Sequence, residues 1–230
     1  MIEALVPAGV AVSWTVDDVP GRTLFPQEAA HVRGACDRRR AEFASVRHCA
    51  RAALTALGVP AGPIVPGRGG APTWPASVVG SMTHCRRYRA AAVALRSTAA
   101  AIGIDAEPHE ALPEGARRIV ARAEELSLLR ALDEADPTVR WDRLLFSAKE
   151  SVFKVWYPLT GKRLVLAESS VVLEPDGRLE ATLLPDDAPV RRLRGRWQVS
   201  DGLITTAIIV AADDGAGQWA PAPARLDRSR

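Results

Sequence analysis

The sequence predicts an α+β protein in which helices pack on short antiparallel sheets. Two segments, 38–57 and 138–157, repeat apolar residues at the spacing of a helix. Three short apolar runs lie between them, and after Gly161 the pattern changes to the alternation of β-strands. The length of 230 residues suits one domain, or two small halves packed around one core.

The N-terminal part is expected to contain a strand, a helix and a long loop. Residues 1–12 are apolar and carry no basic region, which indicates a strand rather than a signal peptide. The helix of residues 38–57 is expected to stop at Gly58. Residues 58–77 hold five prolines and five glycines, which indicates an extended loop. The three apolar runs are expected to form strands at residues 78–82, 90–95 and 100–104.

The C-terminal part is expected to contain two helices followed by two hairpins. Residues 114–132 predict one helix, and residues 138–157 predict another that ends at Pro158. Pro175-Asp176-Gly177 and Ser200-Asp201-Gly202 each separate two alternating segments, which is typical of β-hairpins. Residues 213–230 are rich in Gly, Ala, Pro and Arg, and we expect a frayed tail there.

Composition and charge narrow the class of protein. No apolar run approaches the roughly 18 residues that span a bilayer, so no membrane partner is expected. The three cysteines form no CxxC pair and are odd in number, which favours a reducing cytoplasm over a disulfide framework. Residues 33–51 hold six arginines against two acidic residues, whereas the whole chain has a net charge of only +3. This local positive charge indicates an anionic partner for that segment.

The first candidate site is Gly103-Ile104-Asp105-Ala106-Glu107, where an apolar strand leads into two carboxylates. Residues i and i+2 of an extended chain point to the same side, so Asp105 and Glu107 repel each other unless a cation lies between them. Carboxylate oxygens are hard ligands and favour Mg²⁺ over softer metals. The alternative is a strand end followed by a solvated acidic turn.

The second candidate is Glu150, in the segment Phe146-Ser147-Ala148-Lys149-Glu150-Ser151-Val152-Phe153-Lys154. On a helical wheel Glu150 lies opposite the broad apolar face, where a surface pair with Lys154 would be the ordinary interpretation. However, Phe146, Phe153 and Tyr157 lie on the same side as Glu150. A solvated face rarely carries three aromatic residues, so we expect this side of the helix to line a cleft.

Two further groups suggest binding of an anion. Gly80-Ser81-Met82-Thr83-His84 follows an apolar strand and offers a flexible glycine, two hydroxyls and an imidazole that could face a phosphate. A histidine that caps a turn is the alternative. Arg47 and Arg51 fall within roughly 20° of Arg40 on the helical wheel, at the border of the apolar face. They are therefore expected at the edge of a buried groove.

Taken together and in this order, these segments resemble the 4′-phosphopantetheinyl transferases, of the larger monomeric kind that activates peptide synthetases and polyketide synthases. The likeness covers residues 42–160 well and the two ends poorly. Two departures concern the rim of the coenzyme pocket: Arg68 stands apart from the loop proline, and Arg86-Arg87 replace a glycine that the family tends to keep. The matching stretches are Glu42-Phe43, Arg47, Cys49-Ala50-Arg51, Pro72-Thr73-Trp74-Pro75, Gly80 to Cys85, Gly103 to Pro108, and Phe146 to Lys154.

The resemblance implies a fold of two similar halves, each a small antiparallel sheet packed on a long helix, with coenzyme A in the cleft between them. We expect the halves at residues 1–106 and 107–212. The implied reaction moves the phosphopantetheine arm of coenzyme A to a serine of an apo acyl or peptidyl carrier protein and releases 3′,5′-ADP. A cytoplasmic monomer that serves peptide, polyketide, siderophore or antibiotic synthesis is the corresponding expectation.

The expected catalytic group consists of three carboxylates and a lysine. Asp105, Glu107 and Glu150 are expected to hold Mg²⁺, with Mn²⁺ as an alternative, against the coenzyme pyrophosphate. Glu150 is also the expected general base for the serine hydroxyl. Lys154 is expected to stabilise the pyrophosphate oxygens as the bond breaks. Lys149 points about 100° away on the helix and is a weaker candidate for the same role.

The expected coenzyme-binding residues are mostly basic. Arginine suits phosphate because its planar fork binds two oxygens at once. We expect the 3′-phosphate and adenosine side of coenzyme A to contact Arg47, Arg51, Ser81 and His84. Arg68 is the one basic candidate near the loop proline.

Two other functions remain open at this point. A metal-dependent phosphohydrolase would use the same carboxylates to cleave a nucleotide or coenzyme pyrophosphate with water. A basic binding module would use residues 33–51 as a nucleic-acid helix, and its binding would fall steeply with salt. The segment has no aromatic platform and the rest of the chain is slightly acidic, so we expect no nucleic-acid partner.

Overall fold

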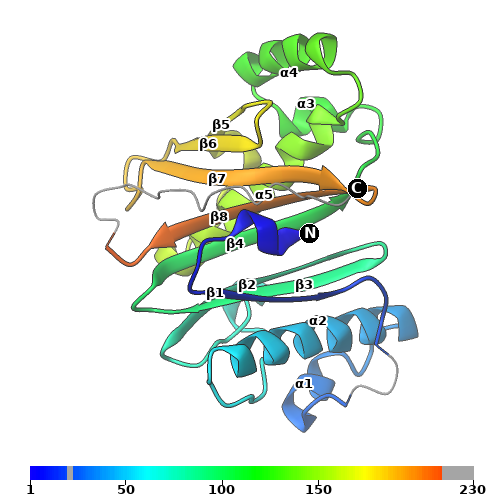
Figure 1. The fold of residues 1–230 in the computed structure, drawn as a ribbon, viewed down its shortest axis with the longest axis vertical. Helices are drawn as coiled ribbons and strands as arrows, with labels where there is room; N and C mark the ends of the chain where they lie inside the picture. Colours follow the sequence, from blue (N-terminus) through cyan, green and yellow to red (C-terminus); the bar gives the residue numbers. More distant parts are fainter. Residues whose placement is uncertain (20–22, 214–230) are drawn as a thin grey trace, which may run out of the picture.

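The computed structural model describes residues 1–19 and 23–213, and it arranges their strands in two antiparallel sheets (Figure 1). The first sheet has the order β1-β3-β2, and its strands are β1 (Val10–Thr15), β2 (Val78–Cys85) and β3 (Tyr88–Leu95). The second sheet has the order β4-β8-β7-β6-β5, and its strands are β4 (Ala99–Pro108), β5 (Ser169–Leu173), β6 (Arg178–Leu183), β7 (Arg192–Ser200) and β8 (Leu203–Ala211). Both expected hairpins, β5–β6 and β7–β8, are confirmed.

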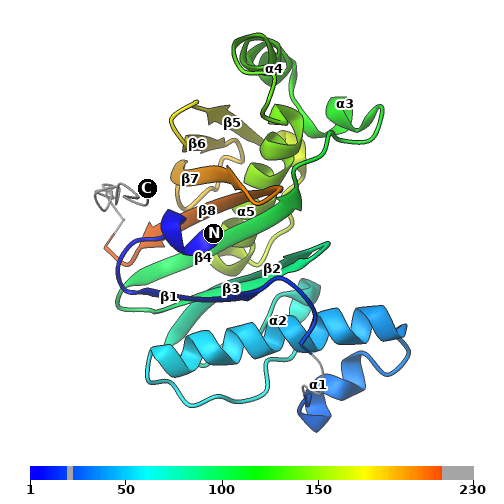
Figure 2. The same ribbon diagram turned by 45° about the vertical axis from the view of Figure 1, so that its right-hand side comes forward.

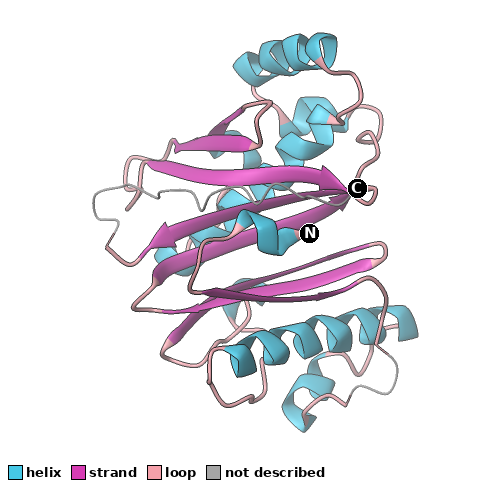
Figure 3. Cartoon of the chain, viewed as in Figure 1, coloured by secondary structure: helices cyan, strands magenta, loops and turns pink. Residues whose placement is uncertain are grey.

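One long helix lies against each sheet (Figure 2). α2 (Asp37–Ala56) packs on the first sheet and α5 (Trp141–Thr160) on the second, and each is 20 residues long. The shorter helices are η1 (Ile2–Leu5), α1 (Pro26–His31), η2 (Arg68–Gly70), α3 (Ala116–Val120), α4 (Ala123–Ala135) and η3 (Leu166–Glu168). The expected α+β class is confirmed (Figure 3). No helix within the described ranges is long and apolar enough to cross a bilayer.

The two sheets meet where β2 runs beside β4 (Figures 1 and 2). Here the backbone N–H groups of Ile104 and Ala106 donate to side-chain hydroxyls, those of Ser81 and Thr83, at 3.1 Å each. A buried apolar cluster continues across the junction. Its buried members from η1 and the two sheets are Ile2, Leu5, Val79, Tyr88, Ala90, Ala92, Ala94, Ala99, Ile102, Ile104, Ala106, Leu203 and Ala207.

Two expected elements, those of residues 1–12 and 114–132, were wrong in their bounds. Residues 1–12 form η1 and the start of β1, because Pro7 and Gly9, at φ +88°, interrupt the strand. The expected helix of residues 114–132 is divided into α3 and α4, since the Glu125 carboxylate accepts the Arg122 N–H at 2.7 Å and begins a new helix. The prolines and glycines of residues 58–77 do form the expected loop.

The second long helix continues past Pro158 instead of ending there. Proline lacks the N–H that would donate to the Lys154 carbonyl, so one helical hydrogen bond is lost while the last turn continues. The end is satisfied by Gly161, whose N–H donates to the Tyr157 carbonyl at 2.8 Å and whose φ of +67° suits a C-terminal cap.

The expected division into two halves stays a prediction. Its boundary, between residues 106 and 107, falls inside β4, which pairs with β8 of the second sheet. The two sheets also differ in their number of strands. The expected tail of residues 213–230 lies, apart from Asp213, outside the described residues.

Candidate active site

The expected carboxylates lie where α5 crosses β4. The approach of the two elements is so close that a Cβ atom at Gly103 would lie 2.0 Å from the Ser151 carbonyl oxygen, so only glycine fits. On α5, four polar residues follow one another at intervals of four, three and four positions, which places them on one stripe of the helix. They are Arg143, Ser147, Glu150 and Lys154.

Asp105 is the most tightly held member of the group. Its side chain is buried, and Lys154 Nζ donates to Oδ1 at 2.7 Å. The Thr83 hydroxyl donates to the same oxygen at 3.1 Å, and the Ser147 hydroxyl donates to Oδ2 at 2.9 Å. Lys154 also donates to the Ile104 carbonyl at 2.9 Å. The lysine is therefore fixed beside the Asp105 carboxylate.

Glu107 and Glu150 interact with Asp105 through charge. Burial raises the pKa of both glutamates, and the negative charge of Asp105 raises each pKa further. Positive charge opposes the rise, from Arg143 at Glu107 and from Lys154 at Glu150. Arg143 Nη1 donates to Glu107 Oε2 at 2.9 Å. The site therefore concentrates negative charge that two basic residues of α5 balance in part.

These residues fit a divalent cation by their chemistry. Within residues 1–19 and 23–213, no group of three or more His, Cys, Asp or Glu side chains is already arranged to hold a metal ion. Asp105 and Glu107 instead contact Lys154 and Arg143. The donor set, three carboxylates whose charges disfavour one another, is nevertheless the set that hard cations such as Mg²⁺ prefer.

A cavity of about 910 Å³ extends away from Lys154 between the two long helices. Its walls come from α2, residues 66–74, β2 and the C-terminal half of α5. This volume lies within the range of small-molecule and cofactor sites. Aromatic residues of α5 line it, since Phe153 and Tyr157 contact each other with ring centroids 5.9 Å apart. Lys154 therefore lines a cavity together with two of the expected aromatic residues, whereas Glu150 is not among the residues that line it.

Basic side chains gather on the α2 wall of this cavity. Arg39 Nη1 contacts His84 Nε2 at 2.8 Å, which requires a neutral imidazole that accepts the hydrogen bond. Burial, and then the charge of Arg39, lower the pKa of His84. Arg47 is buried, with Nε donating to the Ile64 carbonyl at 2.8 Å. Burial lowers the pKa of Arg47 to about 10, so the guanidinium stays charged at neutral pH.

Known proteins of one family are similar to this chain over most of its length. Residues 27–94 match the model of the 4′-phosphopantetheinyl transferase N-terminal domain, and residues 101–207 match that of the 4′-phosphopantetheinyl transferase superfamily. The chain is 51% identical over 227 residues to the 4′-phosphopantetheinyl transferase Svp of Streptomyces mobaraensis, covering 95% of this chain and 92% of Svp. The chain belongs to the 4′-phosphopantetheinyl transferase superfamily.

Two further relatives are similar over nearly their whole length. The transferase PptT of Mycobacterium tuberculosis is 40% identical, with 91% of this chain and 98% of PptT covered. The transferase Npt of Nocardia iowensis is also 40% identical, with 92% of this chain and 100% of Npt covered. The expected activity is thereby confirmed: the chain is a 4′-phosphopantetheinyl transferase that uses coenzyme A and an apo carrier protein.

The structure does not bring Lys149 to the cavity of this transferase. Lys149 is fully buried on the other side of α5, and its ammonium donates to Glu125 Oε2 at 2.7 Å. It also donates to the carbonyls of Leu166 and Ser169, at 2.9 and 3.1 Å. The offset of about 100° from Glu150 carries it into the core of the second sheet, so its expected contact with coenzyme A was wrong.

Arg51 is also directed away from the cavity and does not line it. Its Nη1 donates to both carboxylate oxygens of Glu28, at 3.0 and 3.2 Å. Glu28 is fully buried, and it also accepts the N–H groups of Phe25 and Ile64, at 2.9 and 2.8 Å. Arg51 therefore balances a buried carboxylate that joins α1 to α2, which corrects its expected role as a coenzyme ligand.

Arg68 and Ser81 do line the cavity. Tyr157 of α5 donates its hydroxyl hydrogen to the Arg68 carbonyl at 2.6 Å, which fixes the loop over the cavity. Gly69, at φ +67°, lies so close that a Cβ atom would be 2.4 Å from the Tyr157 hydroxyl oxygen. Ser81 is buried, and its hydroxyl oxygen accepts the Ile104 N–H.

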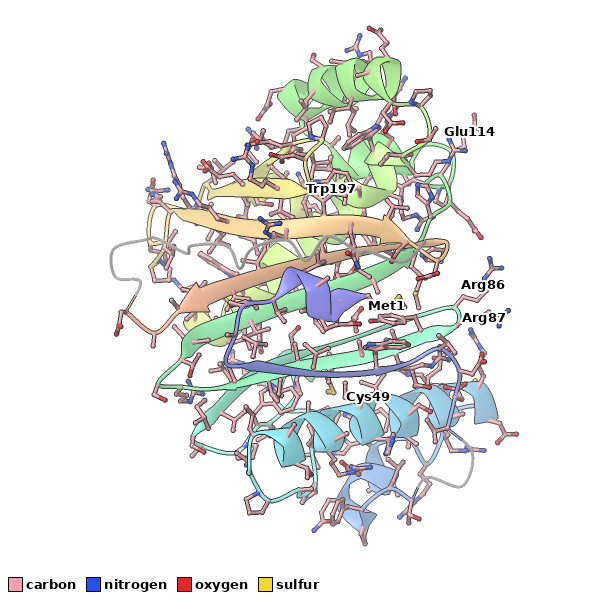
Figure 4. All side chains as sticks on the ribbon, in the orientation of Figure 1. Met1, Cys49, Arg86, Arg87, Glu114 and Trp197 are labelled. Carbon is pink, nitrogen blue, oxygen red and sulfur yellow. The ribbon has the colours of Figure 1, made fainter. Side chains whose placement is uncertain are left out.

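Arg86 and Arg87 form the turn between β2 and β3, at the edge of the molecule (Figure 4). Arg87 has φ +60°, the left-handed conformation that favours glycine, which accounts for the glycine expected near this position. Both side chains are largely exposed, and they pair with Glu110 and Asp17 respectively.

Sequence reasoning missed Arg39 and Arg143. The helical wheel favoured Arg40, but that side chain pairs with Asp37 at the start of α2, while Arg39 lines the cavity. Arg143 shares the spacing of Ser147, Glu150 and Lys154, a signal that could have identified it. Ser147 shares this spacing and Thr83 lies in the segment from Gly80 to His84, but the contact of their hydroxyls with Asp105 follows only from the tertiary fold.

Proposed function

We propose that this transferase binds coenzyme A in the cavity described above, with the 3′-phosphate near Arg39, Arg47 and His84 and the pyrophosphate near Lys154. The observation that supports this arrangement is that Lys154 lines the same cavity as the basic residues of the opposite wall. An arginine fork and an imidazole suit a phosphate monoester, and an ammonium beside a carboxylate cluster suits the phosphate that reacts.

The residues around Asp105 then divide the work of the reaction. Asp105, Glu107 and Glu150 would hold Mg²⁺ or Mn²⁺, which when bound neutralises the charge that develops on the pyrophosphate. Glu150 accepts the proton of the carrier serine, a role that the raised pKa of a partly buried carboxylate suits. Lys154 donates to the pyrophosphate oxygens as 3′,5′-ADP leaves.

The partners we propose are carrier domains of peptide synthetases and polyketide synthases. We also propose that the enzyme acts as a monomer, with both long helices that line the cavity supplied by the same chain. The three free cysteines suit a cytoplasmic location. α2 packs against the first sheet and Arg47 is buried there, an arrangement that favours a coenzyme ligand over nucleic acid as the anionic partner.

Mass spectrometry of an apo carrier protein tests this function. Incubation with enzyme, Mg²⁺ and coenzyme A is expected to add the mass of one phosphopantetheine group to the carrier serine. Release of 3′,5′-ADP without any gain in the mass of the carrier would instead indicate a phosphohydrolase. Omission of Mg²⁺ in the presence of a chelator is expected to abolish the gain, since three carboxylates would remain unneutralised.

Arg39→Ala is expected to raise the Michaelis constant for coenzyme A about tenfold, the effect of losing one charge-assisted hydrogen bond, with little change in turnover. Arg40→Ala is the matched control, because Arg40 is adjacent on α2 but pairs with Asp37. Steady-state kinetics of both variants measure the difference. Equal Michaelis constants for the two variants would place the 3′-phosphate elsewhere.

The affinity for 3′,5′-ADP is expected to rise as the pH falls toward and below 6.5, the ordinary pKa of histidine. Burial and Arg39 lower the pKa of His84 in the free enzyme, so the imidazole is neutral at pH 7. A bound phosphate raises that pKa, and binding therefore takes up a proton. Calorimetry in two buffers measures this uptake. His84→Asn is expected to reduce it, and equal uptake by both proteins would remove His84 from the phosphate site.

A further inference from the structure

A line of three buried hydroxyl groups ends on Asp105. The Ser147 hydroxyl lies 2.9 Å from Asp105 Oδ2 and 3.0 Å from Thr206 Oγ1. Thr206 Oγ1 lies in turn 2.7 Å from the Ser151 hydroxyl. Ser147 and Ser151 belong to α5, whereas Thr206 belongs to β8, directly opposite Asp105 in the strand pairing. All three hydroxyl-bearing side chains are buried.

The chemistry of the groups sets the direction of the step that reaches Asp105. An ionised carboxylate only accepts hydrogen bonds, so Ser147 must donate its single hydrogen to Asp105. The Thr206 hydroxyl has one hydrogen as well, and it reaches two acceptors of Ser147, the hydroxyl oxygen at 3.0 Å and the carbonyl oxygen at 3.1 Å. Either bond holds Ser147 against β8, and the Ser151 hydroxyl contacts Thr206 Oγ1 at 2.7 Å.

This arrangement leaves Asp105 little freedom. Oδ1 already accepts from Thr83 and Lys154, and Oδ2 accepts from Ser147. A carboxylate has about four lone-pair positions, so one position on Oδ2 remains for a further ligand. The hydrogen bond from Ser147 therefore determines which lone pair of Asp105 Oδ2 stays available to a further ligand.

We propose that Thr206 is a positioning residue of the transferase, which acts through Ser147 to orient Asp105 toward the catalytic cation. This inference rests on the proposed function, in which Asp105 is a ligand of that cation. Partners of metal ligands commonly alter metal affinity or activity by about 10-fold to 100-fold when they are removed, because the ligand loses its fixed orientation.

Thr205 offers a matched control beside Thr206. It is equally buried, on the opposite face of β8, where it pairs with Ala106. Its hydroxyl has no hydrogen-bond partner within the part of the chain that the structure describes. Thr205→Val and Thr206→Val thus make the same chemical change one residue apart, and only the second interrupts the line to Asp105.

The test compares Thr206→Val, Thr206→Ser and Thr205→Val with the wild-type enzyme. Thr206→Val is expected to lower turnover about tenfold and to weaken binding of Mn²⁺ about tenfold, as is usual for partners of metal ligands. Mn²⁺ binding is measured by electron paramagnetic resonance without coenzyme or carrier. The Michaelis constant for coenzyme A is expected to stay within about twofold, because Thr206 is remote from the basic wall. Thr206→Ser keeps the hydroxyl and is expected to restore both quantities.

Equal turnover and Mn²⁺ binding in Thr206→Val and Thr205→Val would overturn the inference. Failure of Thr206→Ser to restore Mn²⁺ binding would also overturn it, because the effect of Thr206→Val would then come from the shape of the side chain and not from loss of the hydroxyl. Absence of Mn²⁺ binding by the wild-type protein would overturn it together with the metal proposal. If the wild-type protein instead binds Mn²⁺ but adds nothing to apo carriers, the proposed function fails, while the Mn²⁺ comparison still decides the role of Thr206.

Discussion

Glu150→Gln is expected to lower the rate of phosphopantetheine transfer by about 10²-fold or more, since it removes both a general base and a charge for the cation. Glutamine keeps the size of the side chain, so the walls of the cleft stay in place. Burial raises the pKa of Glu150, which means that its charge is unfavourable in the folded protein. The variant is therefore expected to unfold at no lower temperature than the wild type.

The mass-shift assay, run at saturating coenzyme A, measures this loss. The control is Glu134→Gln, which makes the same change at an exposed position of α4. The Michaelis constant for coenzyme A is expected to change only a few-fold in the Glu150 variant, because the basic wall is intact. Near-normal transfer by Glu150→Gln would remove the central residue from the proposed mechanism.

Lys149→Met is expected to destabilise the protein by about 3–5 kcal/mol, the usual consequence of leaving one partner of a buried ion pair alone. The charge left unpaired is that of Glu125, which is itself buried and accepts the Lys149 ammonium at 2.7 Å. Two backbone carbonyls also lose their donor. Urea unfolding followed by circular dichroism gives the difference in free energy of unfolding.

Lys154→Met separates stability from catalysis on the same helix. Its ammonium is partly exposed, and Asp105 keeps the hydroxyls of Thr83 and Ser147 as donors, so the loss in unfolding free energy is expected to be smaller than for Lys149→Met. Its transfer rate is expected to fall about 10²-fold, as for removal of a group that stabilises developing charge. The reverse pattern, with Lys149 needed for catalysis and Lys154 for folding, would contradict the placement of both side chains.

The two central motifs of the site could be predicted from the sequence because each motif lies within one strand or one helix. Asp105 and Glu107 alternate on a strand, and Glu150 and Lys154 are one turn apart on a helix. The periodicity of these elements predicts which side chains share a face. The two hairpins could be predicted equally well, because an Asp-Gly dipeptide marks the turn of each.

Contacts between distant segments could not be read in the same way. A helical wheel shows that Arg51 and Arg47 share one side of the helix. The buried Glu28 that accepts hydrogen bonds from Arg51, however, belongs to a separate short helix. Likewise, nothing near Thr206 in the sequence indicates that β8 pairs with β4 and brings its hydroxyl to the helix that carries Ser147. Such roles follow from strand order, which the local pattern does not encode.

The apolar cluster at the junction of the sheets also sets the width of the cleft. Where the two sheets meet, β3 contributes Ala90, Ala92 and Ala94 to this cluster, whose members from β4 include Ile102 and Ile104. Small side chains allow the sheets to approach until the hydroxyls of β2 reach the amides of β4. Adding methyl groups there would wedge the sheets apart, a change that overpacked cores resist by about 1–3 kcal/mol. The spacing between the arginines of α2 and Lys154 of α5 thus depends on alanines that do not themselves line the cavity.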